Sequence, residues 1–499
     1  MAAIIALAGG IAAWTLSLAS ASQGLTNYEV NFESELLASL SSPEQLCSPG
    51  SACYENATTR WLSDWGIPHF DIIVRPTTQE DVESAIRVAN KYNKPFLAIS
   101  GGHGATLTLS KLENGVGIWM DALKNVTING STARIGGGIT SGELRDELAK
   151  LGKQSTTGGC DCTGAVAPML GGGHGWLQGR YGLMADNLIS ANLVLANGSC
   201  VTVSKSSHPE LFWALRGAGH NFGIVVDFEY RIYDITEENA AWSYEKLYYS
   251  LDRLEDVLDV VNGMIGTIDE PAPVELIVFG LVGRNPSVAR GELTLVIYLI
   301  WQGAAIPAAF AEPFNAIPTL SIVAETTDLP GVTALLGWTN DDGPCNTNSP
   351  TLQRFPVALK TYPIPGIRAA VDLLDSMPVE FNNSALILEG YSTNAVQAVP
   401  KENTAYPDRL NNLLIAPFIR HAANDAELEK FGSDYGNEMR QLIVDASGQG
   451  LNAYANYAHG SETQQKLYGH ETWRLEKLRK LKREWDPENR FGWYLAIEI

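Results

Sequence analysis

The chain has 499 residues, of which 45% are hydrophobic and 18% are charged. This balance is typical of a globular protein, and the length is sufficient for two domains. A formal net charge of −21 excludes a nucleic acid as a partner, because a phosphate backbone repels such a surface.

The N-terminus has the pattern of a secretory leader. Residues 1–24 carry no charge, and an apolar run from Ala2 to Leu18 precedes the small residues Ala19-Ser20-Ala21. We therefore expect residues 1–21 to be a signal peptide, although the leader lacks Lys and Arg. An N-terminal membrane anchor is the alternative, for which the apolar run is short. No later stretch predicts a membrane span in the mature chain.

Sequons and cysteines agree with a secreted protein. Cys47 and Cys53 flank Pro49-Gly50 and are placed to close a small disulfide loop in an oxidising compartment. No His/Cys spacing predicts a metal site. Five Asn-x-Ser/Thr sequons predict N-glycosylation, at Asn56, Asn125, Asn129, Asn197 and Asn382.

The first half of the chain predicts a dense mixture of helices and strands. Asp71–Val74 and Pro95–Ile99 are short apolar runs typical of strands, and a helix signal begins between them at Thr78 with Asp81 three residues later. Hairpins are predicted at Asn129-Gly130 and Asn197-Gly198. Further elements are a helix opening at Thr140, a helix at 209–215 and a strand at 223–232.

From about Thr236 to Gly450 the pattern changes. Strands are predicted at 276–279 and 294–298, and helices at 249–265 and 424–446. The last fifty residues contain Tyr454-Ala455-Asn456-Tyr457 and a basic helix at 472–483.

Two glycine-rich segments about sixty residues apart each carry a nucleophilic side chain. The first is Ser100-Gly101-Gly102-His103-Gly104, and the second runs from Gly158-Gly159-Cys160-Asp161-Cys162 through Gly164 to Gly171-Gly172-Gly173-His174-Gly175. Glycine lets the backbone approach a ligand closely, and converging backbone N–H groups suit a phosphate. The two segments indicate a large phosphate-bearing cofactor, placed for covalent attachment.

These segments and others in the same order resemble the berberine-bridge-enzyme-like FAD-linked oxidoreductases. This oxygen-dependent family lies within the vanillyl-alcohol-oxidase / para-cresol-methylhydroxylase (PCMH) superfamily. The resemblance covers nearly everything after the leader. Besides the glycine segments it is carried by Arg75-Pro76, Arg180–Asn187, Trp213–Val225, Tyr454–Tyr457 and Asp486–Phe491.

The resemblance implies an α+β fold with a two-part FAD-binding domain of the PCMH type. Its parts would be residues 25–235, with a core at about 67–235, and a returning segment at 451–499. An inserted substrate-binding domain with an antiparallel sheet would occupy residues 236–450.

The resemblance also implies that FAD is attached twice. His103, as a neutral imidazole, would join the flavin 8α-methyl, and Cys160, as a thiolate, would join C6. Cys160 lies eleven residues before the triple glycine, as in the family, so Cys162 would be a bystander. Further cofactor-binding residues implied are Ser100, Gly101, Gly102, Gly104, Gly164, Gly171, Gly172, Asn187, Gly223, Ile224, Val225 and Asn456.

The catalytic candidates are tyrosines. A hydride leaves a carbon bearing a hydroxyl or amine more easily when a base takes the O–H or N–H proton, and a tyrosine with a depressed pKa can do this. Tyr457 and Tyr454 hold the family position. Residues three apart in a strand face opposite sides, so we expect Tyr457 to be the base and Tyr454 a flavin-side wall. Glu389, Tyr391 and Arg420 are polar residues in apolar runs that either line the pocket or face solvent.

We therefore expect an FAD-dependent oxidoreductase that removes a hydride from a small organic alcohol, phenol or amine. Secondary-metabolite biosynthesis is the expected setting, and molecular oxygen is the expected electron acceptor. A secreted sugar or oligosaccharide oxidase is an alternative, for which Trp301 and Trp338 are candidate stacking residues. A flavin-binding protein without significant turnover is an alternative of another class. His174 is expected to be packed or at the surface, and the sequence predicts no oligomeric state.

Overall fold

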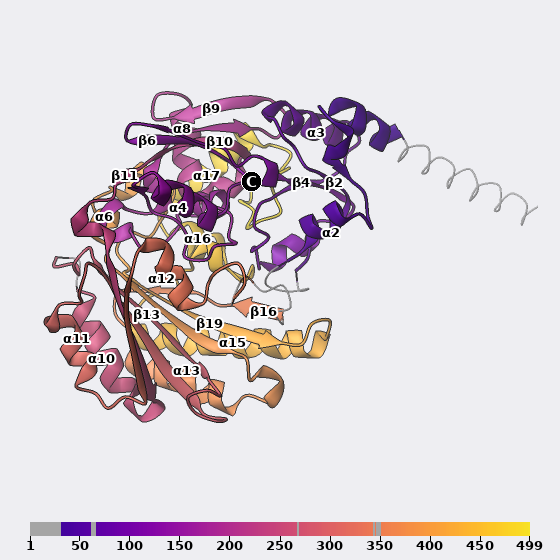
Figure 1. The fold of residues 1–499 in the computed structure, drawn as a ribbon. Helices are drawn as coiled ribbons and strands as arrows, with labels where there is room; N and C mark the ends of the chain where they lie inside the picture. Colours follow the sequence, from indigo (N-terminus) through magenta and orange to yellow (C-terminus); the bar gives the residue numbers. More distant parts are fainter. Residues whose placement is uncertain (1–30, 61–65, 267–268, 343–344, 346–350) are drawn as a thin grey trace, which may run out of the picture.

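The computed structural model describes residues 31–60, 66–266, 269–342, 345 and 351–499 (Figure 1). The predicted signal peptide lies outside these residues. None of the helices described is long and apolar enough to cross a membrane.

The strands of a small mixed sheet flank the first glycine segment in the sequence. Its strand order is β1 (Leu46–Cys47), β2 (Phe70–Val74), β4 (Gly115–Trp119) and β3 (Phe96–Ile99), with β2, β4 and β3 parallel. Helix α3 (Gln79–Lys91) joins β2 to β3. It starts at the predicted capping box of Thr78 and Asp81 and buries its apolar face against the sheet. Helix α2 (Ala52–Thr58) packs beside β2.

A second, antiparallel sheet lies beside the first. Its order is β5 (Val126–Asn129), β6 (Thr132–Gly136), β10 (Ile224–Arg231), β8 (Leu188–Val194) and β9 (Cys200–Ser204). Both predicted hairpins, β5–β6 and β8–β9, are confirmed. The helices of this part are α4 (Ser141–Lys150), α5 (Val166–Leu170), α6 (Gln178–Tyr181), α7 (Met184–Asn187) and α8 (Pro209–Ala218), and β7 (Lys153–Gln154) pairs with β11 (Tyr233–Asp234).

A large antiparallel sheet forms the middle of the chain. Its order is β15 (Ser321–Thr327), β12 (Trp242–Ser250), β14 (Leu293–Gln302), β13 (Leu276–Arg284), β18 (Ala385–Tyr391), β19 (Leu413–His421) and β16 (Thr351–Arg354), with β17 (Val357–Leu359) also on β19. Helices α10 (Leu254–Met264), α11 (Ala308–Asn315), α13 (Ile364–Ser376) and α15 (Ala426–Ser447) cover one face (Figure 1). The opposite face is left for the site.

The helices of this region were predicted incompletely from the sequence. The helix predicted at 249–265 begins at Leu254, because Tyr249 is the buried penultimate residue of strand β12. Five helices were not predicted, namely α11 and α13 together with the short helices α9 (Glu237–Ala240), α12 (Leu329–Leu336) and α14 (Asn394–Gln397).

The C-terminal segment packs back onto the first part of the chain. Helices α16 (Gln464–Tyr468) and α17 (Thr472–Trp485) share one apolar core with β6, β8, β10 and α8. The ammonium of Lys482 is fully buried and donates to the carbonyl of Asn221 at 3.0 Å and to Asp486 at 2.7 Å. The Phe491 ring lies edge-on to Phe96.

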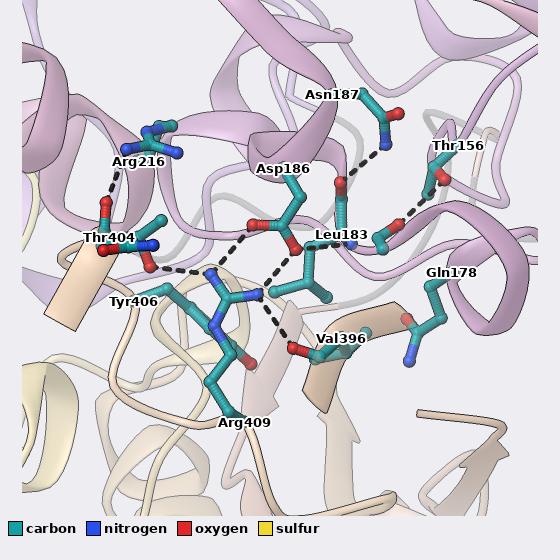
Figure 2. A network of polar contacts seen from close by, with 12 residues as sticks. Thr156, Gln178, Leu183, Asp186, Asn187, Arg216, Val396, Thr404, Tyr406 and Arg409 are labelled. Atoms are coloured by element: carbon teal, nitrogen blue, oxygen red, sulfur yellow. Dashed lines mark hydrogen bonds and ion pairs between the residues drawn. The ribbon is translucent and has the colours of Figure 1, made fainter. Parts of the chain in front are cut away.

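A buried ion pair joins the first part of the chain to the middle part (Figure 2). Arg409 binds Asp186 through both guanidinium nitrogens, at 2.6 and 2.9 Å, and both side chains are at most 5% exposed. Arg409 also donates to the Thr404 hydroxyl, and Arg216 donates to the carbonyl of Asn403. Because breaking a buried pair leaves an uncompensated charge, this contact fixes how the two parts meet.

Candidate active site

One cavity of about 870 Å³ lies where the two glycine segments, the open face of the large sheet and the C-terminal segment meet. Its size is that of a ligand pocket for a large cofactor or substrate. Both glycine segments predicted from the sequence contribute to its wall.

The first glycine segment follows β3 directly and carries His103 into the cavity. A side chain at Gly101 would collide with the Cys162 carbonyl and the Gly164 amide, so glycine is needed where the two segments cross. Burial, together with the nearby charges of Arg354 and Arg60, lowers the pKa of His103 to about 3. The imidazole is therefore neutral at pH 7, which is its nucleophilic form.

The second segment contains two cysteines that differ in their bonding state. Cys162 forms a disulfide with Cys345, which the sequence analysis did not predict. Cys160 is a free thiol in the cavity wall, and burial and the Glu389 charge raise its pKa to about 12. The expectation of a thiolate is wrong for the unmodified chain, because the thiol is protonated at neutral pH and has to lose its proton before it attacks. The predicted Cys47–Cys53 disulfide is present.

Most of the predicted cofactor-binding residues line the cavity. These are Ser100, Gly101, Gly102, His103, Gly104, Cys160, Gly164, Gly223, Ile224, Val225 and Asn456. The hydroxyl of Ser100 is buried there and has no hydrogen-bond partner among the described residues. A buried donor of this kind needs a ligand atom or an ordered water.

Gly171, Gly172 and Asn187 lie outside this cavity wall. A side chain at Gly171 would collide with the Asn456 amide, and one at Gly172 with the Tyr406 ring. Asn187 donates to the carbonyls of Tyr181 and Leu183 and accepts from the Tyr233 hydroxyl, so it holds the turn between α6 and α7. Of these contacts, that of Gly171 reaches a residue of the cavity wall, Asn456.

The two candidate tyrosines both face the cavity. Their spacing predicted opposite sides of a strand, and this prediction is wrong. Residues Ala455–Tyr457 form a 3₁₀ turn, in which residues three apart share a face. The rings of Tyr454 and Tyr457 lie 5.2 Å apart. The Tyr454 hydroxyl accepts from the His174 backbone N–H at 3.1 Å and from the Asn456 amide at 2.7 Å, which makes it a fixed wall.

Tyr457 instead points to a carboxylate. Its hydroxyl donates to Oε1 of Glu389 at 2.9 Å, and the Tyr391 hydroxyl donates to Oε2 at 2.6 Å. Glu389 lies on β18, is 3% exposed, and burial raises its pKa. The predicted depression of the Tyr457 pKa is wrong, because burial and the Glu389 charge raise that pKa well above 10. The sequence named Glu389 as a candidate but did not pair it with Tyr457.

Aromatic rings complete the wall beside Gly159 of the second glycine segment. Trp338 stacks on Trp176 at 5.5 Å, and Phe279 meets Trp338 edge-on. Trp301 packs on Phe310 outside the cavity, so it is not the stacking residue that the sugar-oxidase alternative needs. His174 is packed against Tyr391 and Tyr454, with a pKa lowered to about 4 by burial.

Comparisons with known proteins match this arrangement. Residues 70–204 match the family model described as an FAD binding domain, and residues 453–498 match the model described as berberine and berberine like. The fold and these two matches define a flavoprotein of the PCMH superfamily, which confirms the predicted fold class.

Two curated relatives cover nearly the whole chain. The FAD-linked oxidoreductase chyH of Penicillium rubens is 36% identical over 505 residues, with 98% of each chain covered. The FAD-linked oxidoreductase chry5 of Gibberella zeae is 34% identical, covering 97% of this chain and 98% of the relative. The chain belongs to the berberine-bridge-enzyme-like FAD-linked oxidoreductases, and it is an enzyme of that kind.

Solved structures share the fold at lower identity. The BBE-like 1 protein of Physcomitrella patens has a TM-score of 0.78 at 21% identity, covering 94% of this chain and 99% of that chain. Glucooligosaccharide oxidase from Acremonium strictum, whose structure concerns a 6-S-cysteinyl, 8α-N1-histidyl FAD, has a TM-score of 0.78 at 22% identity, covering 93% and 99%.

Proposed function

We propose that this FAD-linked oxidoreductase holds its flavin through both His103 and Cys160 and withdraws a hydride from a small organic alcohol, phenol or amine. Molecular oxygen is the proposed electron acceptor, and secondary-metabolite biosynthesis the proposed setting. The observation that carries the proposal is the hydrogen bond from Tyr457 to Glu389 in the same cavity as His103 and Cys160.

The cavity residues fit FAD. The backbone around Gly101 and Gly102, with the unpartnered Ser100 hydroxyl, would hold the pyrophosphate, and His103 and Cys160 lie in the wall of the same cavity. The neutral imidazole of His103 suits attack on an electrophilic methyl group. When bound, FAD supplies the two-electron acceptor, and the chain's own residues bind, orient and deprotonate the substrate.

Proton removal falls to Tyr457 and Glu389 acting together. The raised pKa of Tyr457 means that its phenol stays protonated at neutral pH and is a poor base alone. Its oxygen accepts the substrate O–H or N–H proton while its own proton passes to Oε1 of Glu389. Tyr391 holds the other carboxylate oxygen and so keeps Oε1 aimed at Tyr457.

We further propose the domain boundaries expected from the sequence, 25–235 with 451–499, and 236–450. Separate apolar cores on the two sides support this division. Secretion with N-glycosylation is also proposed. It is supported by the exposure of all five sequon asparagines: Asn56, Asn125, Asn129, Asn197 and Asn382.

A secreted sugar oxidase is the second candidate. It is favoured by the stacked Trp176 and Trp338 in the cavity wall and by the shared fold with chitooligosaccharide oxidase, which has a TM-score of 0.76 at 21% identity. The Tyr457–Glu389 pair argues against a flavin protein without turnover, because a buried carboxylate costs free energy that a purely structural wall does not need.

The test is a screen for peroxide release. The purified yellow protein is incubated in air with aromatic alcohols, phenols and amines, and in parallel with mono- and oligosaccharides. Release from the first group supports the proposal, and release from sugars alone supports the second candidate. Flavin that no compound of either group reduces anaerobically would contradict both.

A further inference from the structure

The charges around the cavity are unbalanced. Three guanidinium groups, from Arg60, Arg354 and Arg420, reach its wall, whereas Glu389 is the one carboxylate among the described lining residues. Glu389 is engaged by two tyrosine hydroxyls and forms no ion pair within the described chain. Since arginine stays protonated, the described wall carries a surplus of positive charge.

Two of these arginines lie together on the open face of the large sheet. Leu352 on β16 pairs with Arg420 on β19, and Arg354 pairs with Phe418, so the two guanidinium-bearing positions are diagonal neighbours on one face. Diagonal positions in a sheet are within reach of long side chains. Like charges at such positions repel, and burial together with the charge of Arg354 lowers the pKa of Arg420.

Neither guanidinium is paired with a carboxylate of the residues that the structure describes. Arg354 is 6% exposed, gives one hydrogen bond to the His103 carbonyl at 2.8 Å, and its Nε is buried with no partner in the described part of the chain. Arg420 is half-buried, and its bonds within the described residues are made by its backbone with Ser384. A buried cation that lacks a carboxylate, as Arg354 does among the described residues, is costly unless an anion joins it.

The pair also lies next to the proposed proton acceptor. The Arg354 guanidinium is 5.3 Å from the centre of the Tyr457 ring. Phe418, Phe279, Tyr298 and Trp338 line the remaining wall with aromatic surface. A ligand that fills this space against the sheet meets aromatic rings along its body and two cations at one end.

We propose that the substrate is a small molecule with an aromatic or other apolar body and a carboxylate, and that Arg420 and Arg354 bind the carboxylate. This inference rests on the proposed function and narrows its substrate class. Arginine suits the role because its planar fork binds a carboxylate through two hydrogen bonds. The carboxylate anchors one end of the substrate, and its reacting C–H is presented beside Tyr457.

The test compares carboxylates with their uncharged amides in the holoenzyme. The visible flavin spectrum of the purified protein is recorded first, because a colourless protein contradicts the proposed function itself. Benzoate, phenylacetate and 3-phenylpropionate are then titrated against benzamide, phenylacetamide and 3-phenylpropionamide. Binding is followed by calorimetry and by perturbation of the flavin absorption.

We expect at least one carboxylate to bind about ten- to a hundredfold more tightly than its amide. Arg420→Met removes that preference without changing the amide Kd, and Arg420→Lys retains part of it. Arg253→Met, on the surface, is the matched control and leaves the preference intact. A thermal unfolding midpoint for each variant shows that it is folded.

Two results would overturn the inference while the proposed function stands. One is a yellow protein in which no carboxylate binds more tightly than its amide. The other is an Arg420→Met variant that keeps both its flavin and the full carboxylate preference, which would show that Arg420 does not bind the carboxylate.

Discussion

Removing one oxygen atom from Tyr457 tests the proton-transfer arrangement. Tyr457→Phe keeps the ring, including its edge-to-face contact with Tyr454, and deletes the hydroxyl that lies 2.9 Å from Oε1 of Glu389. Loss of a positioned acid–base group lowers a rate by about 100- to 10,000-fold. This corresponds to about 2.7 to 5.5 kcal/mol of barrier, at 1.36 kcal/mol for each factor of ten.

The measurement is the rate of flavin reduction after anaerobic mixing with substrate, because this step precedes reaction with oxygen. Tyr391→Phe is the matched control. It removes the other hydroxyl bonded to Glu389 but leaves the hydrogen bond from Tyr457. The barrier to flavin reduction should therefore rise by no more than about 3 kcal/mol. Reduction of Tyr457→Phe within threefold of the unmodified rate would refute the relay, and so would a larger loss in Tyr391→Phe.

The pH profile follows from the same pair. Burial raises the pKa of Glu389 above its ordinary 4.5. As pH falls through this raised pKa, the carboxylate takes up a proton and can no longer accept one from Tyr457, so the reduction rate falls on the acid side. Glu389→Gln should lower the rate and abolish that acid limb. An unchanged acid limb in the variant would assign it to another group.

The remaining predictions concern stability. Asp186→Asn unpairs the buried guanidinium of Arg409 and should lower the free energy of unfolding by about 3 to 5 kcal/mol, measured by urea titration. A loss below about 1 kcal/mol would contradict the role of this ion pair in joining the two parts of the chain. Cys345→Ser opens a disulfide spanning 183 residues and should destabilise the fold by up to about 5 kcal/mol, whereas Cys53→Ser, which opens a span of 6, should cost about 2.2 kcal/mol. Equal losses in the two cysteine variants would contradict the chain-entropy argument.

Local signals made the first half of the fold predictable. The capping box at Thr78 places α3 correctly, and the Asn-Gly pairs place both hairpins, because each depends on neighbours in sequence. The glycine segments predicted the cavity for a related reason. At Gly101 the backbone of the second segment leaves no room for a side chain, so the presence of glycine in the sequence already indicates a close contact there.

Long-range contacts escaped prediction. The disulfide of Cys162 joins residues 183 apart, and the hydrogen bond from Tyr457 to Glu389 spans 68 positions. Neither leaves a local pattern. The turn at 455–457 was misassigned as a strand because distant contacts set its shape. The Tyr454 hydroxyl binds the His174 amide, and the Asn456 side chain binds the Pro168 carbonyl.

The central claim is that one cavity holds a flavin bonded to both His103 and Cys160. Mass spectrometry of tryptic peptides prepared in the dark tests it most directly. We expect the His103 peptide and the Cys160 peptide to be recovered joined through a single FAD, with Cys162 in its disulfide with Cys345. Recovery of both peptides without a flavin addition, with all the pigment released by acid precipitation, would contradict it.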